Sequence, residues 1–231
     1  AYCPHLGADL AVGKVIGNRL QCAFHEWEFD EEGQCVKTAV GDPAPKAACI
    51  FNFPTVEYYG VIWAFNGVEP TWTLPKFDRS DDELLINTLV SDVFNCDGWV
   101  FACNTPDMQH IKAVHKIEFK GEDPHKMVDW HEDGFDYDLR ADHQGGVSID
   151  WRLGIRGASF FWQRGTYDDW WLGGIVGFSC PRPGQHRAFV VTAVEKGDGS
   201  DAALALAHER MEIAKLLLDR TINEDKDILN S

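Results

Sequence analysis

The alternation of apolar and polar residues divides the chain into two regions. Up to about residue 67 the apolar runs are short, as in KVIGNRLQC, EFDEEGQCV and GVIWAFNG, and turn dipeptides such as Gly-Asn and Asn-Gly break them. Short runs between such dipeptides are typical of β-hairpins. The pattern predicts a small β domain over residues 1–68.

The stretch EPTWTLPKFDRSDDE is irregular, acidic and flanked by proline, so we expect a domain boundary there and a second domain over residues 84–231. After residue 124 come runs rich in β-branched and aromatic residues: HKMVDWHEDGFDYDLRAD, GVSIDWRLGIRG, ASFFWQRG, WWLGGIVGFSC and HRAFVVTAVEKG. Glycine, proline or aspartate separates them, which predicts an antiparallel sheet. From Asp201 the apolar spacing changes to three and four, which predicts a long helix.

Composition narrows the classes of protein that remain. The chain has 231 residues, of which 45% are hydrophobic, and a net charge of −16. This charge disfavours binding to nucleic acid or to an anionic membrane surface, because both need Lys and Arg. The sequence has no apolar run of about 18 residues and no basic-then-apolar leader, so we expect no membrane association.

Seven cysteines, an odd number without regular spacing, predict a reducing compartment, the cytoplasm. The chain begins at Ala1, directly before a motif, and ends within a helical pattern. We therefore expect that strands before residue 1 and sequence after residue 231 are missing.

Two Cys and two His lie near the start of the chain, in CPHLG and CAFHEW. Cys3 and His5 form one pair, and Cys22 and His25 form the other. Such a set can hold a structural zinc ion or an iron–sulfur cluster in which two His replace two Cys on one iron. Zinc fingers usually take both Cys from one knuckle, whereas here each loop supplies one Cys and one His. The spacing favours a [2Fe-2S] cluster.

A second group of candidate ligands lies in NTPDMQHIKAVH. We expect a helix here, with Asn104 or Thr105 as its cap. On a regular helix Asp107 and His110 are about 60° apart, but His110 and His115 are roughly 140° apart. The helix must therefore contain a π-bulge or end before His115. Two imidazoles and one carboxylate form the facial triad of oxygen-activating iron(II) proteins.

The segments CPHLGADL and CAFHEWEFDEEGQCV closely resemble the Rieske motif of the Rieske non-heme iron oxygenases, in the alpha (catalytic) subunit family of ring-hydroxylating type. The resemblance implies that Cys3 and Cys22 bind one iron of a [2Fe-2S] cluster and that His5 and His25 bind the other. Members of this family usually have glycine where this chain has Glu26.

The resemblance extends over nearly all of the chain, and the segment DxxHxxxxH implies that His110 and His115 bind a mononuclear Fe(II). It also implies that Asp107 bridges to a Rieske histidine of a neighbouring subunit.

The family's third ligand is an aspartate on a late helix, and TINEDKDIL lies in the matching place. We select Asp225 because EDxxIL resembles the ligand segment, with Asp227 and Glu224 as alternatives.

The family implies an α+β fold, in which a small antiparallel β Rieske domain precedes a helix-grip-like catalytic domain with an antiparallel sheet and long helices. It implies oxidation of a small organic substrate with O2, by hydroxylation, demethylation or desaturation, and the resemblance leans towards aromatic or sterol-like substrates. Electrons would come from NAD(P)H only through a separate reductase or ferredoxin. The expected assembly is a homotrimer or a multiple of it.

Two other functions remain open on the sequence: a Rieske electron-transfer or regulatory protein with a vestigial second metal site, and a zinc-stabilised binding module. Several further residues are expected to have structural roles only. LGGIVG lacks the GxGxxG form of a dinucleotide loop. Trp162, Trp170 and Trp171 are candidates for a substrate cavity or for the core. The remaining histidines are expected to be surface or core residues: His125, His131, His143, His186 and His208. The remaining cysteines are expected to be buried thiols: Cys35, Cys49, Cys96, Cys103 and Cys180.

Overall fold

The computed structural model describes residues 1–120, 126, 128–143 and 145–230 and divides into two compact units. The first unit comprises Ala1–Val56 and Ile62–Pro70, and the second comprises Glu57–Val61 and Thr71–Ser231. The boundary between the units crosses a hairpin made of β5 (Thr55–Tyr58) and β6 (Val61–Ala64). The turn of this hairpin belongs to the second unit, and the outer ends of both strands belong to the first. No helix among the described residues is long and apolar enough to cross a membrane.

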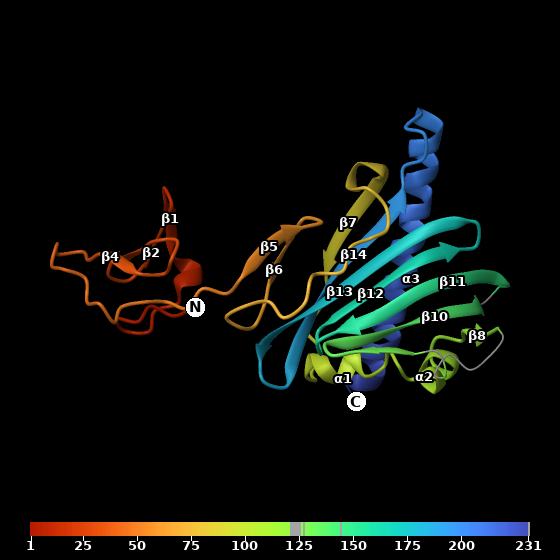
Figure 1. Ribbon diagram of the computed structural model, residues 1–231, viewed down its shortest axis with the longest axis horizontal. Helices are drawn as coiled ribbons and strands as arrows, with labels where there is room; N and C mark the ends of the chain where they lie inside the picture. Colours follow the sequence, from red (N-terminus) through yellow and green to blue (C-terminus); the bar gives the residue numbers. More distant parts are fainter. Residues whose placement is uncertain (121–125, 127, 144, 231) are drawn as a thin grey trace. The chain divides into compact units, whose positions relative to one another are not determined.

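The first unit contains a four-stranded antiparallel sheet in the order β1-β2-β3-β4 (Figure 1). Its strands are β1 (Lys14–Ile16), β2 (Arg19–Gln21), β3 (Glu28–Phe29) and β4 (Cys35–Lys37), and a short 3₁₀ helix (Leu10–Val12) precedes them. Gly17 at the β1–β2 turn has φ +58°, which glycine adopts without steric cost. A small core lies beneath this sheet, made of Cys3, Leu10, Cys22, Phe29, Cys35 and Ala48.

The second unit is built on an eight-stranded sheet in the order β7-β14-β13-β12-β11-β10-β8, with β9 also paired to β10. All pairings are antiparallel, as the sequence pattern predicted. The strands are β7 (Leu84–Val90), β8 (Glu118–Phe119), β9 (Asp129–His131), β10 (Gly134–His143), β11 (Val147–Arg156), β12 (Phe160–Tyr167), β13 (Trp170–Arg182) and β14 (Gln185–Glu195). LGGIVG lies inside β13, so it is a strand and not a dinucleotide loop.

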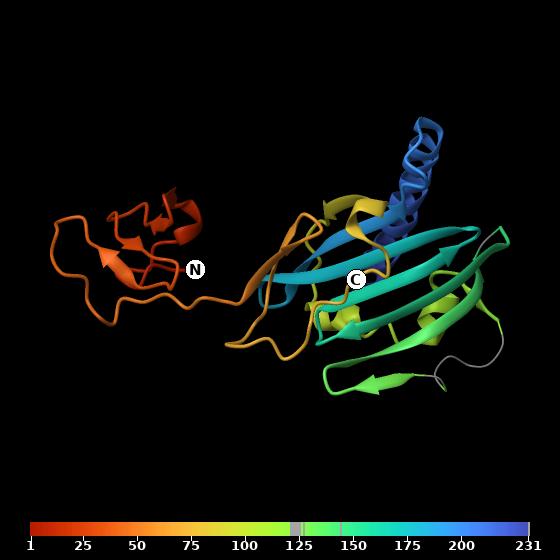
Figure 2. The same cartoon turned by 45° about the horizontal axis from the view of Figure 1, so that its top comes forward.

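Three helices accompany this sheet: α1 (Gly98–Ala102), α2 (Met108–Ala113) and α3 (Asp201–Leu229), with a 3₁₀ turn (Asp81–Glu83) before β7. Helix α3 runs along one face of the sheet and ends close to α1 (Figures 1 and 2). Its first turn is capped by Ser200, whose hydroxyl accepts a hydrogen bond from the Ala203 N–H. The buried residues of α3 recur at three and four: Ala207, Met211, Ala214, Leu218, Ile222 and Asp225.

The core of the second unit lies between α3 and the sheet. On β10, Tyr137, Leu139 and Ala141 are buried on this face, while Asp138 and Arg140 are exposed on the other, as period-two alternation requires. Strand β13 departs from alternation, because its first eight residues are all buried. The segment before β7 covers its outer face, where the Phe77 ring meets the Trp171 ring edge-on at 5.4 Å.

Candidate functional site

The first cysteine-histidine loop is a tight turn closed at both ends by Cys3. The Cys3 carbonyl accepts from the Gly7 N–H at 2.8 Å, and the Cys3 N–H donates to the Ala8 carbonyl at 2.8 Å. Gly7 has φ +75°, in the left-handed region. The two hydrogen bonds close the loop and hold Cys3 and His5 two positions apart on it.

The second loop repeats this construction around Cys22. Its carbonyl accepts from the Glu26 N–H at 3.1 Å, and its N–H donates to the Trp27 carbonyl at 2.8 Å. Glu26 has φ +53°, the conformation of Gly7 in the first loop. The departure from glycine noted in the sequence therefore lies at the one position of the loop where a Cβ is unfavourable.

The two loops bring the predicted cluster residues together in pairs. Cys3 and Cys22 are buried and their side chains contact each other, and the rings of His5 and His25 lie 4.7 Å apart between centroids. His5 also stacks on Trp27 at 4.3 Å with an interplanar angle of 7°. The two thiols thus lie in the core of the first unit, and the two imidazoles lie nearer to its surface.

Backbone N–H groups point at both cluster cysteines. Burial raises the pKa of the Cys22 thiol, but the N–H groups of Phe24 and His25 and the Cys3 side chain outweigh burial, so that this pKa lies below its usual value. The Cys3 sulfur also accepts from the N–H groups of His5 and Leu6, but burial and the neighbouring Cys22 side chain outweigh them, so that the pKa of the Cys3 thiol lies above its usual value. Two sulfur donors with N–H groups aimed at them, opposite two imidazoles, fit a [2Fe-2S] cluster with a Cys₂ iron and a His₂ iron.

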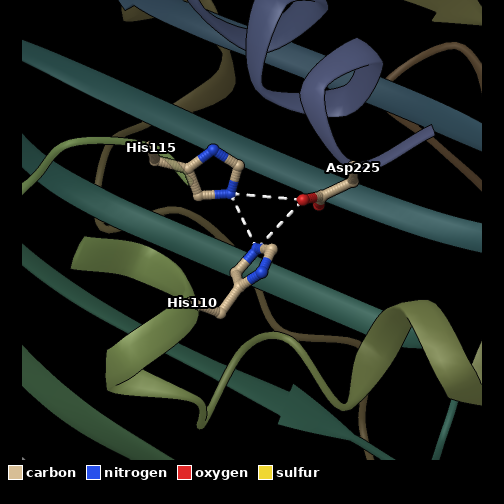
Figure 3. A group of neighbouring side chains, drawn as sticks. All are labelled: His110, His115 and Asp225. Atoms are coloured by element: carbon tan, nitrogen blue, oxygen red, sulfur yellow. Dashed lines mark hydrogen bonds and ion pairs between the residues drawn. The ribbon is translucent and has the colours of Figure 1, made fainter. Parts of the chain in front are cut away.

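The second unit brings His110, His115 and Asp225 together (Figure 3). His110 lies on α2, His115 follows two residues after α2 ends, and Asp225 lies on the last turns of α3. The end of α2 at Ala113 removes the angular conflict between the two histidines. Of the two solutions that the spacing allowed, the helix ends early.

The three ligand atoms lie at distances that suit one metal ion. The Nε2 atoms of His110 and His115 are 3.0 Å apart, and Asp225 Oδ1 lies 2.9 Å from the first and 3.5 Å from the second. Atoms about 2.1 Å from a common metal and at right angles to one another lie roughly 3.0 Å apart. Among the described residues Asp225 Oδ1 is buried and forms no hydrogen bond, since its short approach to His110 lacks hydrogen-bond geometry. This donor set fits a facial triad for iron(II).

Glu224 contacts the triad through the Nδ1 atom of His115. His115 Nδ1 lies 2.9 Å from Glu224 Oε2, and because a carboxylate only accepts, Nδ1 donates and Nε2 keeps its lone pair. Burial raises the pKa of Glu224, but the bonds from His115 and Arg220 outweigh it, so the pKa lies below its usual value. Asp227, the other alternative to Asp225, is exposed.

Asp107 forms the N-cap of α2, so the cap predicted at Asn104 or Thr105 was wrong. Its carboxylate accepts from the N–H groups of Gln109 at 2.9 Å and His110 at 3.1 Å, and it is exposed. An Asp side chain is a favoured acceptor for the first free N–H groups of a helix, so α2 begins after Asp107. Asn104 and Thr105 instead line a cavity.

This cavity of about 140 Å³ lies between the inner sheet face and α3, beside the triad. His110, His115 and Asp225 are part of its wall. Most of the other wall residues are apolar, and they include Leu139, Ile149, Leu153, Phe161, Val176 and Phe178.

Of the two roles expected for the tryptophan candidates, the core is the one observed. Trp162, Trp170 and Trp171 are buried but do not line the cavity, whereas Trp151 does. Sequence reasoning also missed Gln163 and His143 as wall residues. Burial and the nearby Arg220 lower the pKa of His143.

The remaining candidates have no part in either centre. His186 is fully buried, with Nδ1 2.8 Å from the Cys96 carbonyl oxygen and its ring stacked on Phe94. His125 lies outside the described residues. All seven cysteines are free, and the prediction of buried thiols was wrong for the three that are exposed: Cys49, Cys103 and Cys180.

Comparison with known proteins identifies the domain that contains the first of these centres. Residues 1–54 match the Rieske [2Fe-2S] domain. The chain is 34% identical over 121 residues to cholesterol 7-desaturase nvd of Xenopus laevis, which covers 50% of this chain and 27% of that protein. It is 43% identical over 125 residues to methylxanthine N1-demethylase NdmA of Pseudomonas putida, covering 49% of this chain and 33% of that protein. The matched part is therefore about a third or less of each of these relatives.

Solved structures resemble the chain over its whole length. Dicamba monooxygenase bound to dicamba aligns with a TM-score of 0.73 and 19% identity, over 99% of this chain and 74% of that chain. Pseudomonas putida CBB5 NdmA with caffeine aligns with a TM-score of 0.70 and 21% identity, over 100% and 68%. At such identities the likeness concerns the fold, and this fold is the α+β arrangement predicted from the sequence.

The cluster loops and the matched domain define a Rieske [2Fe-2S] protein. In its partial relatives and in its fold, the chain as a whole is similar to the Rieske non-heme iron oxygenases.

Proposed function

We propose that this chain is the catalytic part of an oxygenase that oxidises a small organic substrate with O2, by hydroxylation, demethylation or desaturation. The observation that carries the proposal is the triad of His110, His115 and Asp225 in the wall of an apolar cavity. When bound, a [2Fe-2S] cluster supplies single electrons and a mononuclear iron activates O2. Cys3, His5, Cys22 and His25 would hold the former, and the triad the latter.

The side chains of the chain have distinct tasks in this proposal. Asp225 supplies the negative charge that two neutral imidazoles lack, and its burial at 3% exposure keeps water from competing for that charge. Glu224 holds the Nδ1–H of His115, so that Nε2 faces the centre with its lone pair. The apolar wall holds a substrate by burial of its carbon skeleton and excludes bulk water.

Electrons would arrive from NAD(P)H through a separate reductase or ferredoxin, in a reducing compartment such as the cytoplasm. We further propose a homotrimer or a multiple of it, in which Asp107 links the triad of one subunit to a Rieske histidine of the next. Support for the substrate range comes from the relatives, whose names include cholesterol 7-desaturase, methylxanthine N1-demethylase and 5,5'-dehydrodivanillate O-demethylase.

The alternative is an electron-transfer or regulatory Rieske protein with a vestigial second site. A complete triad beside a cavity, with a buried carboxylate oxygen that forms no hydrogen bond among the described residues, opposes it, because such an oxygen is costly to bury unless a cation compensates it. A zinc module is opposed by the division of Cys and His between the loops.

The test uses Asp225→Ala, with Asp227→Ala as the matched control on the same helix. The wild type and the control are expected to hold three irons per chain and to show a Rieske absorption spectrum. Asp225→Ala is expected to hold two irons and to keep that spectrum, while it loses substrate-dependent O2 consumption. If the wild type itself holds only two irons, the oxygenase proposal fails.

A further inference from the structure

One titratable side chain in the cavity wall, His143, has no part in the triad or its support. Among the wall residues that the structure describes, the other titratable groups are the three of the triad and the pair of Arg220 with Glu224, which are 2.7 Å apart. A histidine that lines a reaction cavity without binding the metal is a candidate proton donor or acceptor.

The sheet places His143 beside Tyr167. His143 ends β10 opposite Val147 of β11, and Tyr167 ends β12 opposite Ile149 of the same strand. Val147 and Ile149 are two positions apart, so they share one face of the sheet with their cross-strand partners. Ile149 lines the cavity, so this is the inner face. The Nδ1 atom of His143 lies 3.2 Å from the Tyr167 hydroxyl oxygen.

This contact gives the two nitrogens of the imidazole different surroundings. Nδ1 faces Tyr167, which is not among the described residues of the wall. Nε2 is then the nitrogen through which the ring can serve the cavity. Tyr167 is half-buried, and the exposed residues Asp168 and Asp169 follow it directly. The pair of His143 and Tyr167 thus connects the cavity to a solvent-exposed end of the sheet.

Both groups of this pair are neutral near pH 7. Burial and Arg220 lower the pKa of His143 more than Glu224 raises it. Burial raises the pKa of Tyr167, so its hydroxyl keeps its proton. A neutral imidazole has one N–H and one lone pair, and a phenol likewise both donates and accepts. Each group can therefore accept a proton on one side while it donates a proton on the other.

The proposed reaction consumes protons inside the cavity. Hydroxylation converts R–H, O2, two electrons and two protons into R–OH and water, and demethylation and desaturation need the same electrons and protons. The electrons come through the metal centres, whereas the protons need a donor at the cavity. Most of the wall is apolar and cannot supply them.

We propose that His143 donates its Nε2 proton to O2 as it is reduced in the cavity, and that Tyr167 replaces this proton through Nδ1. The Tyr167 hydroxyl takes up a proton from water in turn. One pass breaks the Nε2–H bond and the phenolic O–H bond, forms an Nδ1–H bond and a new O–H bond, and moves one proton and no electrons. This inference rests on the proposed function, because the reduction of O2 beside the triad is the process that consumes the proton.

The first experiment follows the imidazole proton itself and needs no substrate. The protein contains nitrogen-15-labelled histidine, and zinc(II) replaces the mononuclear iron so that the second metal centre is diamagnetic. The nitrogen chemical shifts show which ring nitrogen is protonated, and exchange spectroscopy gives the rate at which the ring N–H proton exchanges with water. The signal that is absent from His143→Gln belongs to His143.

We expect the proton on Nε2 in the wild type, and exchange with water that is slower by about tenfold or more in Tyr167→Phe, because the donor to Nδ1 is lost. Tyr58→Phe is the matched control. The Tyr58 hydroxyl is also hydrogen-bonded, to Asp81 at 3.1 Å, but Tyr58 is not among the described wall residues. A proton on Nδ1 in the wild type, or an unchanged exchange rate in Tyr167→Phe, would overturn the inference.

The second experiment uses the chemically reduced, iron-loaded protein. The O2 consumption that depends on the third iron is the difference between the wild type and Asp225→Ala. It should fall about 10²-fold in His143→Gln, with three irons still bound. It should stay unchanged in His208→Gln, because His208 is exposed on α3. A wild-type rate in His143→Gln would also overturn the inference. A wild type with only two irons would remove the oxygenase, while the exchange through Tyr167 would still be measured independently.

Discussion

Glu224 offers a direct test of how the second metal centre is held. In Glu224→Ala the His115 Nδ1–H loses its acceptor at 2.9 Å, so the ring can rotate and the other tautomer becomes accessible. Loss of such an orienting carboxylate typically weakens metal binding 10- to 100-fold, which corresponds to about 1.4 to 2.7 kcal/mol. Glu224→Gln keeps an acceptor oxygen without the charge, and we expect it to fall between the wild type and Glu224→Ala.

The assay is anaerobic competition for iron(II) between the protein and a chelator of known affinity, with the Rieske spectrum as an internal measure of intact protein. Asp227→Ala serves as the control because Asp227 is exposed on the same helix. An unchanged iron affinity in Glu224→Ala would refute the orienting role. Complete loss of the third iron, with Asp225→Ala retaining it, would instead identify Glu224 as the ligand.

Three further predictions follow from single residues. Glu26→Gly relieves the left-handed backbone at φ +53° and should raise the free energy of unfolding by about 0.5 to 1 kcal/mol in urea titrations, whereas the same change at Glu32, whose φ is not positive, should lower it. Burial lowers the pKa of His186, although its hydrogen bond to the Cys96 carbonyl opposes this shift. At low pH the unfolded chain therefore binds a proton at His186 that the folded protein does not bind. The free energy of unfolding should fall as the pH drops below about 6.5, by up to about 1.4 kcal/mol per pH unit. His186→Leu should show a shallower slope between pH 7 and 5, and an identical slope would contradict the assignment. Asp107→Asn keeps the helix cap, because Asn caps a helix as well as Asp does, so the melting temperature should not change. If Asp107 also links subunits, reoxidation of the reduced cluster in a single turnover should slow about tenfold with both metals present. A wild-type rate would mean that Asp107 acts as a helix cap only.

Local patterns in the sequence were enough to predict the strands and the long helix. The alternation from residue 134 onward reflects one buried and one solvated sheet face, and the three-four spacing from Asp201 reflects one buried helix stripe. The same spacing could have separated the three acidic candidates. Asp225 follows Ile222 by three and continues the buried stripe, whereas Glu224 and Asp227 lie off it.

Other features depended on contacts between distant segments. Alternation within a strand does not relate Trp151 on β11 to Trp162 on β12. Only the register of these two strands shows that the two side chains lie on opposite faces, and β13 is buried on both faces. The bond from His115 to Glu224 joins residues 109 positions apart. Whether Cys49, Cys103 and Cys180 are exposed was likewise decided by tertiary packing, because cysteine is equally compatible with core and surface.

The continuity of helix α3 determines where this protein can change in length. A residue inserted anywhere between Ala207 and Ile222 would turn all later positions by about 100° about the helix axis. Asp225 would leave the wall of the cavity, and the apolar stripe before it would be split between two directions. Related chains that keep a carboxylate at this place should therefore accept insertions and deletions in the turn before Ser200 but not within the helix.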